Sequence, residues 1–479
     1  MTASILDLYK ASDATALAGH VRAGDVSAVE VAEAAISVIE DLNPALNAVI
    51  CKLYDIGRAA ATTVDRNAPL AGVPFLLKEL ATNWQGIPAT NSSRFLKDLK
   101  APADSEATRR IKASGLMLLG KANAPENGWS IATEPVLYGP TINPWDATVT
   151  PGGSSGGSAV AVATGMVPIA EASDGAGSIR IPASNCGIIG LKPTRGRVSL
   201  SPFADYWAGG AYFLCVTRTM RDTAAYLDAL AGALPGEAYP VTPPPAPFAE
   251  LAQRRPEKLR IGFTVTPPNG NPLHPDVRRV MEQTTGILTA LGHDVEEHDM
   301  PLDAAALWRT YTDMTCVETA GMFNYMETVV GRPVTPNDVE PVTWAIIQRG
   351  RATMATDHAG RIEAVRQAGR NIVQDLWPYD VFVTPTLTQP PRPVGYYDMS
   401  MTDLDAYNAL WSDANFAFPF NISGQPAMSV PLGVGSTGLP IGVQLIARPG
   451  AEATLLALGT QLEEIAPWRD RRPPMPQQK

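Results

Sequence analysis

Cysteine and histidine are both scarce in this chain of 479 residues. The cysteines stand far apart and form no C-x-x-C pair, which argues against a disulfide framework or a zinc site and favours reduced thiols in a cytoplasmic protein. They are Cys51, Cys186, Cys215 and Cys316. The five histidines are scattered and fit no ligand pattern. We therefore expect no metal and no cofactor.

Long runs of one kind of residue are also absent. The charges sum to −10 at pH 7 and include no block of lysine or arginine, so neither nucleic acid nor an anionic membrane is expected as a partner. No run approaches the roughly 18 apolar residues of a membrane span, and the first residues do not resemble a secretory signal. A small molecule remains the expected partner, and the oligomeric state stays open, a homodimer included.

What the chain does contain is an alternation of helix-like and strand-like segments. Periodic apolar residues predict helices over 11–64, one of them capped by Ser27 and ended by Asn43-Pro44. Short apolar runs between Gly and Pro then predict buried strands of an α/β layer. These runs are Val73–Leu77, Leu116–Leu119 and Gly187–Leu191.

The second half of the chain begins after a proline cluster at 234–248. We expect a strand at Lys258–Val265 and then a helix at Pro275–Leu291, which has proline in its first turn. Helical sequence continues to about Trp377. Further strands are predicted at Tyr379–Thr384, Pro426–Leu432 and Pro440–Ala447.

Two glycine-rich turns, each with a serine, carry the strongest functional signal. Ser154 lies in PGGSSGGS at 151–158, and Ser178 lies in SDGAGS at 173–178, so the two serines stand 24 residues apart. A turn–helix–turn fits that interval. Glycine at this density lets backbone N–H groups converge on a small anionic atom, because glycine adopts the required φ angles without steric cost.

Hydrolysis of an amide requires an activated nucleophile, a base that later protonates the leaving amine, and an oxyanion pocket. Ser178 is the candidate nucleophile. Lys78 ends the apolar run GVPFLLK, where desolvation would lower its pKa from about 10.4 toward 7–8 and make it a base. Ser154 would pass the proton between them, as in Ser-Lys variants of the serine triad. The candidate oxyanion donors are the backbone N–H groups of Gly175, Ala176, Gly177 and Ser178.

These motifs resemble the amidase signature family, and the likeness covers nearly the whole chain. Besides the two serine turns it rests on GVPFLLKE around Lys78, GKANAPE at 120–126, NPWD at 143–146, CGIIGLKPT at 186–194, NISGQPAMSVP at 421–431 and GLPIGVQLI at 438–446. The resemblance implies that Lys78 is the base, Ser154 a bridging serine in a cis peptide, Ser178 the acyl-forming nucleophile and 175–178 the oxyanion hole.

The resemblance also implies the fold, an α/β domain with a large mixed central sheet covered by helices on both faces. The whole chain, 1–479, would form one domain. Its parts would be N-terminal helices (1–65), a catalytic signature core (66–232), a Pro-rich connection (233–258), a variable substrate-pocket region (259–400) and a return to the core sheet (401–479).

Some positions near the motifs depart from the family pattern or are compatible with two roles. Ala176 and Glu79 stand where the family often has Gly and Asp, so the methyl at 176 is tolerable only if φ stays negative there. Trp129 is expected either to line the acyl site or to pack in the core, and Cys316 either to face the substrate or to pack. We expect Ser155, Asp174 and Arg180 to support the Ser178 loop.

The same residues allow other interpretations. A Gly/Ser run alone is typical of a flexible linker, but its flanks favour a catalytic loop. GSSGG at 153–157 matches G-x-S-x-G, yet no strand is predicted before it and no histidine is assigned. The main functional alternative is the glutaminase (A-type) subunit of a tRNA-dependent amidotransferase, although the Asp that would hold glutamine appears displaced near Ser412-Asp413-Ala414-Asn415. A binding protein on an inactive amidase fold is a third.

The substrate is the least determined property. Residues 301–420 supply many Trp, Tyr, Phe and Met side chains, which suit a hydrophobic pocket. The leading hypothesis is a stand-alone serine amidohydrolase that cleaves C–N bonds of hydrophobic amides through an acyl-enzyme. Within the family, the segment SDGAGSIRIPASNCG resembles most closely that of members whose substrates are aryl amides or cyclic and oligomeric amides. The same catalytic residues can also cleave carbamates.

Overall fold

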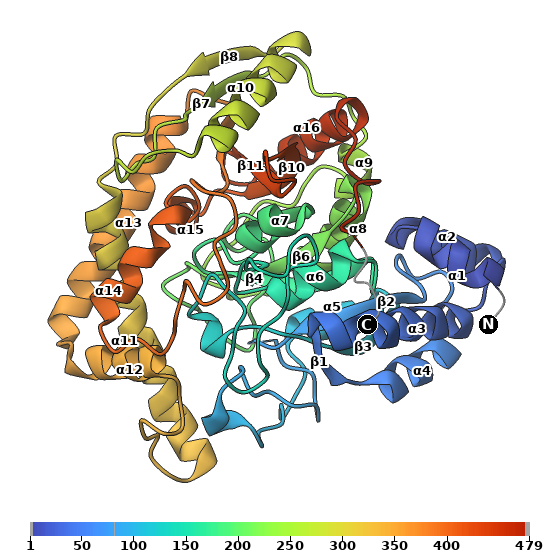
Figure 1. Ribbon diagram of the computed structural model, residues 1–479, viewed down its shortest axis with the longest axis horizontal. Coiled ribbons are helices and arrows are strands. Elements are labelled where there is room, and N and C mark those ends of the chain that lie inside the picture. The colour runs from blue at the N-terminus through green and yellow to red at the C-terminus, as the bar shows by residue number, and fades with distance from the viewer. Residues whose placement is uncertain (1–2, 81, 475–479) are drawn as a thin grey trace.

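The computed structural model describes residues 3–80 and 82–474, and within them a mixed sheet of 11 strands forms the centre of the molecule (Figure 1). Its strand order is β1-β3-β2-β4-β6-β5-β10-β11-β9-β7-β8. The strands are β1 Val49–Lys52, β2 Val73–Lys78, β3 Leu116–Ala122, β4 Ile169–Asp174, β5 Ile189–Lys192, β6 Tyr212–Thr217, β7 Arg260–Phe263, β8 Asp294–Glu297, β9 Val381–Pro385, β10 Ala427–Val434 and β11 Pro440–Ala447.

The helices surround this sheet, with α1–α4 together at one end of the view in Figure 1 and α11–α13 at the other. They are α1 Ala3–Ala11, α2 Ala14–Ala23, α3 Ala28–Leu46, α4 Tyr54–Thr63, α5 Glu106–Ala113, α6 Gly156–Ala163, α7 Arg180–Cys186, α8 Met220–Leu230, α9 Phe248–Leu251, α10 Pro275–Ala290, α11 Ala304–Val330, α12 Pro341–Ala352, α13 Ala355–Leu376, α14 Leu404–Ala409, α15 Pro419–Ser423 and α16 Glu452–Ile465. No described helix is both long and apolar enough to cross a membrane.

Strand β11 shows that helices cover both faces of the sheet. Successive side chains of a strand point to opposite faces. Gln444 accepts a hydrogen bond from Arg180 of α7, whereas its neighbour Leu445 belongs to the apolar cluster that contains Leu288 of α10 and Leu455 of α16. The predicted α/β fold with a helix-covered mixed sheet is therefore confirmed.

The strands predicted from apolar runs are present with small shifts at their ends, and the predicted helix after the proline cluster is α10. Two expectations for the N-terminal segment were wrong. Helix α3 does not end at Asn43-Pro44 but continues to Leu46, because a proline in the last turn removes only one internal hydrogen bond. Residues Val49–Lys52, expected as helix, form β1, which pairs antiparallel with β3.

The turn–helix–turn expected between the two serines was incomplete. Helix α6 begins at Gly156, directly after Ser155, and β4 then returns the chain to Asp174, just before the second glycine turn. Strands β4 and β2 are parallel neighbours, so both end at the same edge of the sheet. This register brings Lys78, the last residue of β2, next to the loop that carries Ser178.

Candidate active site

Lys78 lies at the centre of the site, fully buried among serines. Its Nζ is 2.7 Å from Ser154 Oγ, 2.8 Å from Ser155 Oγ and 2.9 Å from Ser173 Oγ. The Gly153–Ser154 peptide bond is cis. Ser155 also donates its backbone N–H to the Ser178 carbonyl at 3.3 Å, which ties the two serine turns together.

Burial governs the charge of Lys78. Desolvation lowers the pKa of its ammonium group to about 7, although the carboxylates of Glu171 and Asp174 act in the opposite direction. Glu171 lies on β4 and accepts a hydrogen bond from the Lys78 backbone N–H at 3.1 Å and another from the Thr82 hydroxyl. A large fraction of Lys78 is therefore neutral near pH 7 and able to accept a proton.

An ion pair between Asp174 and Arg180 holds the loop that carries Ser178. Two guanidinium nitrogens of Arg180 donate to the two oxygens of Asp174 at 2.8 and 2.9 Å, and both side chains are fully buried. Burial alone would raise the pKa of Asp174, but Arg180 and the Asn421 amide hold it well below its usual range. Asp174 therefore stays ionised and anchors the loop.

The same carboxylate corrects the prediction for the oxyanion donors. The Gly177 N–H donates to Asp174 at 2.6 Å, so it is not available to an oxyanion. The N–H groups of Gly175, Ala176 and Ser178 make no hydrogen bond within the part of the chain that the structure describes. These three remain the candidate donors.

Two glycines of this loop meet requirements that other residues would not: one leaves room for a neighbouring ring, and the other has a positive φ. A Cβ on Gly175 would lie 2.3 Å from the Trp207 ring, and Gly177 has a φ of +120°, which favours glycine. Ala176 is not among the non-glycine residues with positive φ, so its methyl is accommodated without strain. The departure from the family pattern at 176 leaves the loop backbone intact.

Ser154 and Ser178 both line a cavity with largely aromatic walls. Trp129 is one of these walls: its ring centroid lies 5.1 Å from that of Trp207, and its carbonyl accepts the Tyr407 hydroxyl at 2.6 Å. The other aromatic lining residues are Tyr206, Trp207, Phe213, Trp308, Tyr311 and Trp411.

Cys316 does not line this cavity. Its thiol is buried on α11, within an apolar cluster, while Thr312 and Thr315 of the same helix line the cavity instead. The one-residue difference matters because neighbouring positions on a helix point about 100° apart. Of the two alternatives for Cys316, the structure shows packing.

Glu79, the other departure from the family pattern, points away from the serines. It forms a buried ion pair with Lys121 of β3, at 2.7 Å, and accepts hydrogen bonds from the backbone and hydroxyl of Thr90. Successive side chains along extended backbone point in opposite directions, so Lys78 points toward the serines and Glu79 points toward Lys121 and Thr90.

Sequence reasoning missed several residues of the site. Ser173 begins the motif at 173–178 and had no predicted role, although its hydroxyl contacts Lys78. Asn127, in the 3₁₀ turn Glu126–Gly128, lines the cavity, and both polar atoms of its buried amide have no hydrogen-bond partner among the described residues. The only signal in the sequence is its position two residues before Trp129.

Comparisons with known proteins agree with this geometry. A family model described as Amidase matches residues 30–456. The 6-aminohexanoate-cyclic-dimer hydrolase of Pseudomonas sp. (strain NK87) is 38% identical over 98% of this chain and 97% of its own length. The acylamidase of Rhodococcus erythropolis is 30% identical over 96% of each chain.

Solved structures give the same answer. A structure of 6-aminohexanoate cyclic dimer hydrolase complexed with substrate has a TM-score of 0.93 at 36% identity and covers 98% of this chain and 99% of its own. The A-type component of the glutamyl-tRNA(Gln) amidotransferase from Thermotoga maritima is more distant, with a TM-score of 0.75 at 27% identity over 94% of each chain. This chain belongs to the amidase family and is a hydrolase that acts on carbon–nitrogen bonds.

Proposed function

We propose that Ser178, Ser154 and Lys78 form the catalytic triad of this amidase. The observation that carries the proposal is the 2.7 Å contact between Lys78 Nζ and Ser154 Oγ, at the base of a cavity that Ser178 also lines. A buried lysine with a pKa near 7 is suited to general base catalysis, because it exchanges protons close to neutral pH.

The first half of the reaction forms an acyl-enzyme. Ser178 Oγ attacks the substrate carbonyl carbon while its proton passes to Ser154, whose own proton passes to neutral Lys78. The candidate donors, the N–H groups of Gly175, Ala176 and Ser178, stabilise the negative oxygen of the tetrahedral intermediate. When the C–N bond breaks, the proton returns through Ser154 to the leaving nitrogen.

The second half consumes water. Lys78, neutral again, accepts a proton from water through Ser154, and the hydroxyl attacks the acyl carbon of the Ser178 ester. The intermediate collapses, Ser178 regains its proton, and a carboxylic acid leaves. The chain then returns to its starting protonation state.

The cavity selects neutral, hydrophobic substrates. Among the described lining residues, Asp174 alone has a charged side chain, and Arg180 pairs with it, so a substrate charge would find no counterion. Seven of the other lining residues are aromatic, which suits aryl groups and alkyl chains. The named activities of the relatives support cyclic or oligomeric amides and acyl amides. Carbamates with similar hydrophobic groups can be cleaved by the same chemistry.

Asn127 supports a substrate with a second amide group. Its side chain offers one donor and one acceptor, both buried and without a partner among the described residues, at the wall of the cavity. A secondary amide offers the complementary pair, and leaving such groups unpaired costs about 1–3 kcal/mol each. Cyclic dimers and longer oligomers of amides contain a second amide beside the one that is cleaved.

The amidotransferase alternative is not favoured by the position of Asp413. Its carboxylate accepts two hydrogen bonds from Arg392, at 2.6 and 2.9 Å, and one from the Tyr397 hydroxyl, and it does not line the cavity. No described residue of the cavity wall then matches the amino group of glutamine. We therefore propose a stand-alone enzyme, acting in the cytoplasm, where free thiols such as its four cysteines persist.

The test is a hydrolysis screen of the purified chain on anilides, linear and cyclic amides, carbamates, esters and glutamine, with Ser178→Ala in parallel. We expect turnover of hydrophobic amides that Ser178→Ala abolishes, with an unchanged melting temperature. Full activity of Ser178→Ala would refute the assigned nucleophile. Turnover of glutamine alone would shift the assignment to the amidotransferase class.

A further inference from the structure

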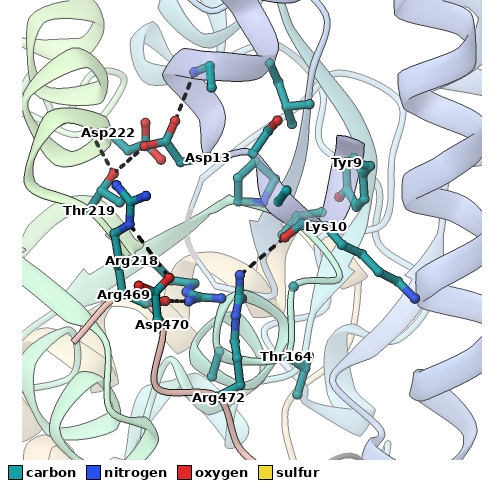
Figure 2. A pocket seen from close by; sticks show the side chains of 18 of the residues that line it. Tyr9, Lys10, Asp13, Thr164, Arg218, Thr219, Asp222, Arg469, Asp470 and Arg472 are labelled. Atoms are coloured by element: carbon teal, nitrogen blue, oxygen red, sulfur yellow. Dashed lines mark hydrogen bonds and ion pairs between the residues drawn. The ribbon is translucent and has the colours of Figure 1, made fainter. Parts of the chain in front are cut away.

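A second cavity, of about 430 Å³, lies away from the serines and shares no lining residue with the first. Its walls come from α1 and α2, from the turn between α6 and β4, from the start of α8 and from the segment after α16 (Figure 2). The volume falls in the range of small-molecule sites. None of the catalytic residues proposed above touches it.

The charges around this cavity are mainly positive, although the chain as a whole carries −10. Five cationic side chains and three carboxylates are among its described lining residues. The cations are Lys10, Arg218, Arg221, Arg469 and Arg472, and the carboxylates are Asp13, Asp222 and Asp470.

Two of the carboxylates already have partners among the residues that form the cavity wall. Asp13 pairs with Arg221 at 2.5 Å and caps α2 through the Ala16 N–H. Asp222 accepts the backbone N–H groups of Ala14 and Thr15, at 2.9 Å each. Neither carboxylate neutralises the remaining arginines.

Arg218, Arg469 and Arg472 are left with weak partners. Arg218 donates one nitrogen to the Arg469 carbonyl, while its buried Nη1 has no partner among the described residues. Arg472 reaches the Lys10 carbonyl at 3.4 Å, and Arg469 lies 3.8 Å from the exposed Asp470. Figure 2 shows the three arginines entering from two segments. Guanidinium donors so arranged match the oxygens of an anion.

Another part of the lining is apolar. It consists of Ala16, Leu17, Val38, Ala163, Val167 and Pro168. A ligand that fills the cavity therefore needs an anionic head for the arginines and an apolar body of a few carbons. We propose that this cavity binds an organic monocarboxylate with a short aliphatic or aryl body.

Isothermal titration of the full-length chain with hexanoate at low ionic strength tests the site, with 1-hexanol, hexylamine and inorganic phosphate as comparison probes. We expect hexanoate to bind at least 10-fold more tightly than each of the others. Equal affinity for 1-hexanol would refute an anion site, and tighter binding of phosphate would refute the carboxylate assignment.

Variants locate the binding. Arg218→Gln and Arg472→Gln are each expected to weaken hexanoate binding by 10-fold or more, whereas Arg255→Gln, at an exposed arginine outside the cavity, should leave it unchanged. Arg469→Gln, whose side chain is 59% exposed, gives a further test if Arg218→Gln unfolds. Hexanoate affinity equal to wild type in both Arg469→Gln and Arg472→Gln would overturn the proposal.

Discussion

At the residue scale, the proposed chemistry depends on Lys78, whose ammonium pKa is lowered to about 7 by its surroundings. Lys78 ends a wholly buried strand, and its three short contacts are all to serine hydroxyls. Hydroxyls accept hydrogen bonds from an amine but bring no negative charge. Desolvation therefore outweighs the more distant carboxylates, and the lysine is available as a base.

This gives a pH prediction. A base acts only when deprotonated, so kcat/KM should be low in acid, rise with a midpoint near pH 7 and level off above it. Glu171 raises the pKa of Lys78, so Glu171→Gln, which keeps the shape and removes the charge, should move this rise to lower pH. The measurement is kcat/KM from pH 5 to 9 on the best substrate of the screen.

A matched control exists for this variant. Glu463 on α16 is also a carboxyl whose pKa burial raises to about 7, but it accepts the Met220 N–H and does not line the serine cavity. Glu463→Gln should leave the pH profile in place. An acid limb that moves up in Glu171→Gln, or that stays in place, would contradict the assigned role of Lys78.

At the element scale, the site depends on the end of β4 and the loop that follows. Asp174 ends the strand, and its carboxylate receives the Gly177 and Ile179 N–H groups and the Arg180 guanidinium. Arg180 in turn reaches Asn421 of α15 and Gln444 of β11. The loop is thus fixed to β4, which precedes it, and to two elements that are distant in sequence.

We expect Arg180→Met to destabilise the fold strongly, because it leaves the buried Asp174 charge without its partner. The cost of breaking such a pair is about 3–5 kcal/mol. Urea unfolding measures it, with Arg58→Met, at an exposed ion pair with Glu33, as the control that should cost less than about 1 kcal/mol. Equal midpoints for the two variants would show that the pair does not anchor the loop.

At the scale of the whole molecule, the substrate cavity is assembled from segments across most of the chain. Trp129 comes from the turn after β3, Trp207 from the loop before β6, Trp308 from α11 and Trp411 from the segment after α14. Trp308 stacks on Trp411 with ring centroids 5.3 Å apart. Shape and polarity of the cavity are therefore properties of the tertiary structure.

Trp308→Ala tests this wall. Removing the ring should lower kcat/KM for bulky hydrophobic amides by roughly 10- to 100-fold and affect small acetyl amides less, since one lost apolar contact surface is worth about 1–3 kcal/mol. The ratio of kcat/KM for the two substrate types is the readout. Trp377→Ala, at a tryptophan that is 57% exposed, should leave the ratio unchanged. An unchanged ratio in Trp308→Ala would remove this wall from the substrate site.

Much of this protein follows from local sequence. Glycine turns, apolar strands and a lysine at the end of one strand depend on short-range sterics and burial. Strands β2, β3, β5, β7, β9, β10 and β11 were therefore predicted from the chain alone, as were the candidates Lys78, Ser154 and Ser178, whereas β4, β6 and β8 were not. The division into parts within a single domain stays a prediction. The presence of β1 was misjudged, because pairing with β3 overrides local propensity, and the extent of α3 was misjudged, because a proline in the last turn does not end the helix.

Only the tertiary structure decided which side chains meet. The sequence does not show that Asp174 takes the Gly177 N–H, that Thr312 and Thr315 rather than Cys316 line the cavity, or that the Asn127 amide has no partner among the described residues. These outcomes depend on the angles between packed elements. On a helix, a shift of one residue decides whether a side chain lines the cavity or packs in the core. The sequence by itself determined the class of chemistry and the catalytic candidates, whereas packing decided the substrate cavity.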